Sequence, residues 1–259
     1  MADTPLHGVG VLVTRPRAQA AELMAAVQSK GGTAISFPVI EIVPRDASAI
    51  ATDARDLPKP DIALFVSRNA VYHGLAYAEG AIKGATGPTT AAAIESAGQT
   101  VEIKPLQGYD SESLLAEPAL QDVAGKQVLI LRGGDGRELL ATTLTERGAN
   151  VNYLSFYERR LPDSSRQSLA GIEAAWRDGK INAVTIMSVE TLTNLIALLS
   201  DWCFQQLEVV PLVTPSTRVI KELLARFPTS RPILAAGPQA DDMVDAIIGI
   251  HSSNSGKAP

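Results

Sequence analysis

The chain is poor in the residues that build disulfides and metal sites. Its 259 residues include one cysteine, Cys203, and three histidines. A single cysteine excludes an internal disulfide and is typical of a reducing, cytoplasmic setting. The histidines, His7, His73 and His251, lie far apart and show no metal-ligand spacing. We therefore expect no metal site.

Long apolar runs and long basic runs are also missing. No run approaches the roughly 18 to 20 apolar residues of a membrane helix, and the N-terminal segment lacks the basic start and apolar core of a secretory signal. The formal net charge is −5, from 23 Lys and Arg against 28 Asp and Glu. This balance disfavours nucleic-acid binding. An anionic ligand must then be attracted locally, by helix N-termini, backbone amides and a few arginines.

The nucleotide-binding motifs are incomplete. A glycine-rich turn, Arg132-Gly133-Gly134-Asp135-Gly136, follows an apolar strand pattern at 128–131 and precedes a helical pattern. The dinucleotide fingerprint requires a further glycine three positions after Gly136, where Leu139 stands, and no GKS or GKT sequence is present. The turn therefore favours a tight bend that exposes amides to an anion over a nucleotide site.

The sequence contains an internal repeat. A shift of 117 positions (128 − 11) superposes 11–41 on 128–158 without a gap. The matched pairs include Val11 with Val128, Arg15 with Arg132, and Gly31 with Gly148. Each copy reads as strand, turn, helix and strand, and ends in a short extended segment. We infer two related halves of about 120 residues each.

Strand and helix patterns alternate along the whole chain, which predicts an α/β fold with parallel sheets covered by helices on both faces. The repeat favours two such sheets, in two domains. In the second half we expect a strand at 183–187, a helix ending near 199, the next strand at 209–213, and a polar, frayed tail from His251 onward. Near residue 110 we expect a helix that begins at Tyr109-Asp110-Ser111.

Polar residues recur where the predicted strands end and the next helices begin. Ligands of open parallel sheets bind at these ends. Each Ser or Thr also has a purely structural interpretation as a helix cap, and the two interpretations stay open for each residue taken alone. A matched set in both repeats favours a shared site. The set is Arg15, Ser67, Thr90, Arg132, Ser188 and Thr217.

Tyr157 ends a strand pattern beside Glu158-Arg159-Arg160. It is either a core residue with its hydroxyl at the edge or a proton donor in a cleft. No Ser-His-Asp or Cys-His arrangement for nucleophilic catalysis is evident in the sequence.

Six segments together resemble the uroporphyrinogen-III synthase family. They are VLVTRPRAQAAELMAAVQSKGG, FVSRNAV, GPTTAAAI, VLILRGGDGRELL with TERGA, FYERR, and the TPSTR helix start. The resemblance covers nearly the whole chain, in order and spacing. It implies a discontinuous first domain, residues 1–38 and 162–259, and a second domain, residues 44–155. Two linker strands, residues 39–43 and 156–161, would join them.

The resemblance also implies the reaction. Hydroxymethylbilane, a linear tetrapyrrole with eight carboxylates, would be cyclised with inversion of ring D and loss of water, without a cofactor. Tyr157 would protonate the departing hydroxyl. The substrate-binding residues would be Arg15, Ser67, Thr90, Arg132, Gly133, Ser188 and Thr217.

One position departs from the family pattern. Glu190 places negative charge in the helix turn after Ser188, which disfavours an anion there. It leaves open an alternative, a non-catalytic two-domain module that binds a small anion. In either case we expect a cytoplasmic monomer that binds no membrane or nucleic acid.

Overall fold

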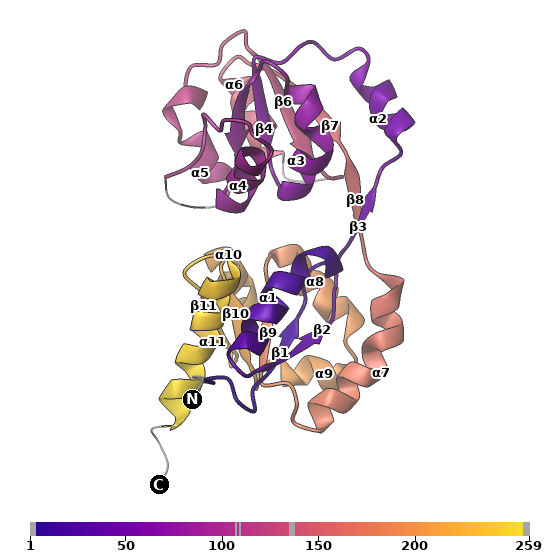
Figure 1. The fold of residues 1–259 in the computed structure, drawn as a ribbon, viewed down its shortest axis with the longest axis vertical. Coiled ribbons are helices and arrows are strands. Elements are labelled where there is room, and N and C mark those ends of the chain that lie inside the picture. Colours follow the sequence, from indigo (N-terminus) through magenta and orange to yellow (C-terminus); the bar gives the residue numbers. More distant parts are fainter. Residues whose placement is uncertain (1–3, 107, 109, 135–137, 256–259) are drawn as a thin grey trace. The chain divides into compact units, whose positions relative to one another are not determined.

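The structure is a computed structural model that describes residues 4–106, 108, 110–134 and 138–255. The chain divides into two compact units. Unit 1 comprises Met1–Glu41 with Arg160–Pro259, and unit 2 comprises Ile42–Arg159. Each unit has its own parallel sheet flanked by helices (Figure 1), which confirms the predicted α/β class.

Within the described residues, the sheet of unit 1 has five strands in the order β11-β10-β9-β1-β2. They are β1 (Gly10–Val13), β2 (Thr33–Ser36), β9 (Ala183–Thr185), β10 (Pro211–Thr214) and β11 (Arg231–Leu234). All neighbouring strands run parallel. All four residues of β1 are buried, as expected for a central strand with helices on both faces.

The helices of unit 1 form two layers. In one layer α1 (Arg17–Ser29) packs against α11 (Ala240–Ser255), and their side chains Leu23 and Met243 join Val11 and Val13 of β1 in one core cluster. Burying each such side chain contributes roughly 1.5–3 kcal/mol. In the other layer α8 (Val189–Leu198) contacts both α7 (Asp163–Arg177) and α10 (Thr217–Arg226), and α9 (Asp201–Gln206) follows α8 in sequence.

The sheet of unit 2 has four described strands in the order β5-β4-β6-β7, all parallel. They are β4 (Ile62–Phe65), β5 (Ile82–Ala85), β6 (Gln127–Arg132) and β7 (Asn150–Ser155). Phe65 pairs with Leu131, and Arg132 pairs with Ser155. The carboxyl ends of β4, β6 and β7 therefore lie at one edge of the sheet, where the next helices begin.

Alternate residues of the unit 2 strands face two separate cores. Ala63, Phe65 and Leu131 pack with residues of α3 (Arg68–Gly74) and α4 (Pro88–Ser96), beside α2 (Ala47–Ala54) and the 3₁₀ turn Leu75–Ala78. Leu64 and Ile130 pack with α5 (Ser111–Leu115), the 3₁₀ turn Pro118–Leu120 and α6 (Leu139–Glu146). The period of two residues explains why both faces are covered.

The strands β3 (Glu41–Pro44) and β8 (Tyr157–Arg160) pair with each other as a two-stranded sheet. They follow the two copies of the repeat, β1-α1-β2 and β6-α6-β7. In each copy the two strands pair in parallel, and the glycine that ends the helix has positive φ, 81° at Gly31 and 85° at Gly148. The internal repeat is therefore a structural repeat.

Three local predictions were wrong. The strand expected at 183–187 ends at Thr185, because Ser188 caps α8 and the chain turns before it. The strand expected at 209–213 runs from Pro211 to Thr214, and a short helix for which the sequence made no prediction, α9 with its cap at Ser200, precedes it. The expected frayed tail is helical from His251 to Ser255, as the last part of α11. Tyr109, Asp135, Gly136 and residues 256–259 of that tail lie outside the described residues.

Candidate active site

Tyr157 is held at both its side chain and its main chain at the carboxyl edge of the unit 2 sheet. The residue is the first of β8 and is 1% exposed. Its hydroxyl lies 2.8 Å from Oγ of Ser67, which follows β4. Its carbonyl accepts a hydrogen bond of 2.6 Å from the N–H of Gly134, which follows β6. The phenol is therefore fixed relative to the ends of two strands.

Gly133 makes room for the ring of Tyr157. A Cβ placed on Gly133 would lie 2.0 Å from Cε2, 2.3 Å from Cζ and 2.5 Å from Cδ2 of that ring. These separations are far below the ~3.5 Å of an ordinary carbon contact. Only glycine allows the turn and the ring to approach so closely. Gly133 is therefore a packing partner of Tyr157.

Ser67 is both a helix cap and a partner of Tyr157. Its Oγ accepts a hydrogen bond of 3.1 Å from the N–H of Ala70, which satisfies one free donor of α3. The same oxygen shares a hydrogen with the Tyr157 hydroxyl. The two sequence interpretations of Ser67, cap or site residue, are thus compatible.

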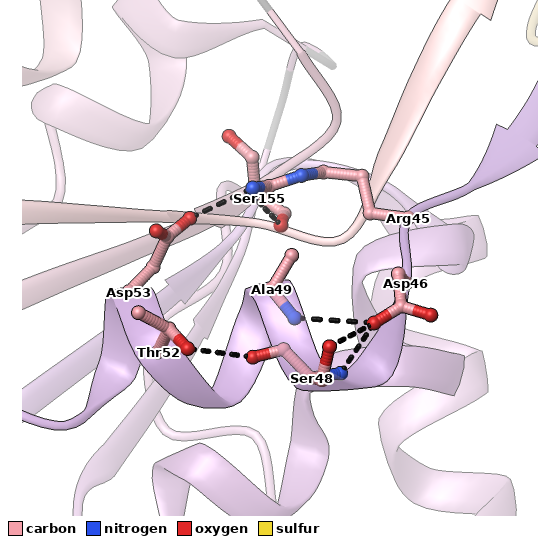
Figure 2. Close-up of polar contacts among 7 residues, drawn as sticks. All are labelled: Arg45, Asp46, Ser48, Ala49, Thr52, Asp53 and Ser155. Carbon is pink, nitrogen blue, oxygen red and sulfur yellow. Dashed lines mark hydrogen bonds and ion pairs between the residues drawn. The ribbon is translucent and has the colours of Figure 1, made fainter.

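The main chain before Tyr157 is anchored by Arg45. The Arg45 side chain donates through Nη1 to the carbonyl of Ser155 at 2.8 Å, and its backbone N–H donates to the carbonyl of Phe156 at 2.9 Å. Asp53 of α2 pairs with Nη2 of Arg45 at 2.8 Å. Figure 2 shows Arg45 extended between Ser155 and Asp53. These contacts join α2 to the chain that leads into Tyr157.

The start of α2 is itself fixed by Asp46. Its carboxylate accepts the N–H of Ser48 at 2.8 Å and of Ala49 at 3.3 Å (Figure 2). The hydrogen bonds from Ser48 hold the pKa of Asp46 below its ordinary value. The helix that carries Asp53 is therefore capped at its first turn, directly after Arg45.

Arg132, at the end of β6, lies between an aromatic ring and a carboxylate. Its guanidinium carbon is 3.7 Å from the centroid of the Tyr153 ring, and its Nη1 lies 3.2 Å from Oε1 of Glu138. The Tyr153 hydroxyl donates to Oε2 of Glu138 at 2.7 Å. Burial, and then this hydrogen bond, raise the pKa of Tyr153 to about 12. The hydrogen bonds from Tyr153 and Arg132 lower the pKa of Glu138.

Thr90 is a different kind of residue from Ser67. Gly87 is the N-cap of α4 and Pro88 its first residue, so Thr90 lies inside the first turn of the helix. It is 3% exposed. Thr90 therefore does not cap the helix, and it lies in the same unit as Ser67, Arg132, Gly133 and Tyr157.

The remaining three candidates lie at strand ends of unit 1. Arg15 follows β1, is buried, and donates through Nη2 to the carbonyl of Pro238. Ser188 caps α8, with its Oγ 3.1 Å from the N–H of Thr191 and 2.9 Å from the Thr191 hydroxyl. Thr217 is the exposed first residue of α10, whose cap is Ser216. Glu190 lies in the first turn of α8, as the sequence indicated.

The described part of the chain contains no group of three or more His, Cys, Asp or Glu side chains placed to hold a metal ion. None of its helices is long and apolar enough to span a membrane.

Together the two sheets and their strand-end residues define an α/β protein of the class that binds ligands where strands end and helices begin. The family model described as uroporphyrinogen-III synthase HemD matches residues 21–245. The chain is 34% identical over 207 residues to the uroporphyrinogen-III synthase of Salmonella typhimurium, covering 75% of this chain and 81% of that one. Its identity to the Escherichia coli synthase is 32% over 209 residues, with the same coverage.

Two solved structures share the fold. A mutant uroporphyrinogen III synthase of Thermus thermophilus matches with a TM-score of 0.67 and 20% identity, over 96% of this chain and 100% of that chain. The Helicobacter pylori enzyme matches with a TM-score of 0.57 and 15% identity, over 93% and 99% of the two chains. The chain belongs to the uroporphyrinogen-III synthase family. It is a cyclising lyase of tetrapyrrole and haem biosynthesis, as the sequence resemblance implied.

Sequence reasoning missed four residues that surround Tyr157 and Arg132. They are Arg45, Asp53, Glu138 and Tyr153. Arg45 contacts Ser155 from a segment distant in sequence, whereas Asp53 and Glu138 lie close in sequence to their partners Arg45 and Arg132. For Tyr153 a signal existed. Tyr153 lies two positions before Ser155, the last residue of β7, so both side chains point to the same side of that strand. Ser155 pairs with Arg132 at the end of β6, which places Tyr153 within diagonal reach of Arg132.

Proposed function

We propose that the chain closes hydroxymethylbilane to uroporphyrinogen III, and that Tyr157 donates a proton or a hydrogen bond to the departing hydroxyl. The observation that carries this role is the pairing of the Tyr157 hydroxyl with Ser67 at the carboxyl edge of a parallel sheet. A positioned acid typically contributes about 10² to 10⁴ in rate. A tyrosine phenol carries an O–H group, which can donate a proton or a hydrogen bond.

The hydrogen-bond network supports a donor role. Ser67 Oγ already accepts from the N–H of Ala70, so its own hydrogen is free to point at the Tyr157 oxygen. In that arrangement the phenol hydrogen is not used by Ser67. The phenol hydrogen is therefore available to the substrate. The Ser67 hydroxyl donates to the phenol oxygen and stabilises it while the phenol shares its proton with the departing hydroxyl.

Positioning would select the isomer. Once the hydroxyl has left, ring D must attack through its substituted carbon, and closure without the enzyme gives the uninverted product. Effective molarity from orientation supplies this selection. The proposed holders of the substrate carboxylates are residues at strand ends and helix starts, where amides and helix dipoles favour anions. They are Arg15, Ser67, Thr90, Arg132, Gly133, Ser188 and Thr217.

The proposed steps are loss of the hydroxyl as water, with the proton supplied by Tyr157, and carbon–carbon bond formation at the substituted carbon of ring D. The older bond from that carbon to its methylene bridge then breaks and re-forms at the free carbon of ring D, whose proton is released and restores the phenol. These steps involve no change of oxidation state and no hydride transfer, so proton transfer and positioning suffice, and we propose that no cofactor takes part. The electron-poor azafulvene left behind is stabilised by oriented dipoles.

The domain organisation is proposed as residues 1–38 with 162–259, and residues 44–155, joined by linker segments 39–43 and 156–161. The pairing of β3 with β8, and the division of the chain near residues 41 and 160, support it. Short linkers rarely fix orientation, so we expect solution scattering to change when a tetrapyrrole binds. An identical profile with and without ligand argues against hinged domains. We also propose a monomer that works in the cytoplasm, without a nucleic-acid partner.

The test of the function is a product analysis. The purified chain, without added metal or cofactor, is supplied with fresh hydroxymethylbilane, and the oxidised porphyrins are separated by isomer. We expect mainly the type III isomer. Only type I isomer at ample protein concentration would refute the proposal.

A further inference from the structure

The exposed carboxylate of Glu138 binds two partly buried donors, the Arg132 guanidinium and the Tyr153 hydroxyl. The Arg132 side chain is 13% exposed and the Glu138 side chain 61%. One carboxylate oxygen contacts the guanidinium at 3.2 Å, and the other accepts the phenol hydrogen at 2.7 Å. The donors thus converge on a single carboxylate from two strands, β6 and β7.

The guanidinium keeps unused hydrogen-bonding capacity. Its Nε is buried and has no hydrogen-bond partner among the described residues. A guanidinium offers five N–H donors in a planar fork that suits a carboxylate with two contacts. Glu138 contacts it through Nη1 alone. The Glu138 carboxylate therefore uses only one of the N–H groups through which the Arg132 guanidinium can bind a carboxylate.

The donors would keep their place without Glu138. The Arg132 guanidinium is stacked on the Tyr153 ring at 3.7 Å, and Tyr153 lies in a strand paired with β6 along its whole length. Glu138 instead precedes α6 and makes no side-chain cap hydrogen bond to that helix. Ion pairs with a well-exposed partner are weak. Release of Glu138 therefore leaves both the helix cap and the stacked pair intact.

We propose that Arg132 and Tyr153 form a subsite for one carboxylate of the substrate, and that Glu138 occupies this subsite until the substrate displaces it. The inference rests on the proposed function, which supplies a substrate with eight carboxylates. A second carboxylate on an already bound molecule competes at high effective concentration, so it displaces a weak internal partner. The carbonyl of Arg132 accepts the N–H of Phe156 at 3.0 Å, which places the subsite close to Tyr157 in the chain.

If Glu138 competes with the substrate, removing its charge should strengthen substrate binding rather than weaken it. Glu138→Gln should lower the KM for hydroxymethylbilane by about two- to fivefold, the order expected for loss of a weak exposed ion pair. Tyr153→Phe removes a donor and should raise KM. The matched control is Glu146→Gln at the exposed end of α6, which removes the same charge and should leave KM unchanged. If Glu138 only holds Arg132 in place, Glu138→Gln raises KM.

A second measurement does not depend on turnover. Titration of the phenols by absorbance should show Tyr153 titrating at about 12, and Glu138→Gln should lower that pKa, because the negative charge of Glu138, which raises it together with burial, is lost. An unchanged pKa of Tyr153 in Glu138→Gln would show that Glu138 does not contact Tyr153. A KM that is unchanged or higher in Glu138→Gln overturns the subsite. A wild-type chain that makes no type III isomer refutes instead the proposed function.

Discussion

Substitution of Gly133 by alanine tests how Tyr157 is held. The new methyl group would lie 2.0 Å from Cε2 of the ring. The ring must therefore retreat by more than about 1 Å to reach the ~3.5 Å of ordinary carbon contact. A 1% exposed side chain has little free space to retreat into. Overpacking of this kind costs typically about 1–3 kcal/mol.

The displacement also acts on catalysis. A shift of this size takes the phenol out of hydrogen-bond reach of Ser67, which is now 2.8 Å away. Misplacement by about 1 Å costs up to about 10²-fold in rate. We therefore expect Gly133→Ala to lower both the melting temperature and kcat, with the type III isomer still formed at the residual rate. Thermal unfolding and single-turnover assays measure the two effects.

The neighbouring glycine provides a matched control. A Cβ on Gly134 meets its nearest atoms, Cα of Glu158 and the carbonyl oxygen of Tyr157, at 3.9 Å, which is ordinary contact. Gly134→Ala should therefore cost far less stability than Gly133→Ala. Equal effects of the two substitutions, or a wild-type melting temperature and kcat in Gly133→Ala, would show that the ring does not rest on Gly133.

Two further predictions concern the surroundings of the site. Asp53→Asn removes the partly exposed ion pair with Arg45 and should lower the free energy of unfolding in urea by under about 1 kcal/mol. Arg45→Met also removes the donor to the Ser155 carbonyl, so it should lower kcat more than Asp53→Asn does. Equal kcat values for the two variants would contradict the anchoring role of Arg45. The pKa of Tyr153 is raised to about 12 in the folded state, so folding favours the neutral phenol. The stability that this preference contributes is complete below about pH 10, the ordinary pKa of tyrosine, and is lost as pH rises toward 12. Tyr153→Phe should therefore reduce the loss of stability at alkaline pH, measured by unfolding at a series of pH values.

Much of the fold could be predicted from local patterns. The buried strands are apolar and short, the helices start at Ser, Asp or Pro and end near glycine, and the repeat carries the pairing of β1 with β2 over to β6 with β7. These features depend on neighbours in sequence. The errors fell at short elements and at the ends of elements. The α9 helix is six residues long and is stabilised by its cap at Ser200 and the buried Cys203, which no periodicity reveals.

The candidate site shows the same division. The strand-end positions of Ser67, Arg132 and Tyr157 follow from the pattern of strands and turns. Their partners do not, because the contacts of Tyr157 with Ser67, 90 positions away, and of Arg45 with Ser155, 110 positions away, depend on the packed sheet. The close approach of Gly133 to the ring likewise requires coordinates.

The most direct test of the account is the single-turnover rate of Tyr157→Phe on hydroxymethylbilane, measured together with the isomer formed. Phenylalanine keeps the ring on Gly133 and removes only the hydroxyl paired with Ser67. We expect a rate lower by about 10² or more, a melting temperature close to wild type, and type III product, because geometry selects the ring carbon. Full activity with an unchanged melting temperature would contradict the account and leave Tyr157 as a packing residue.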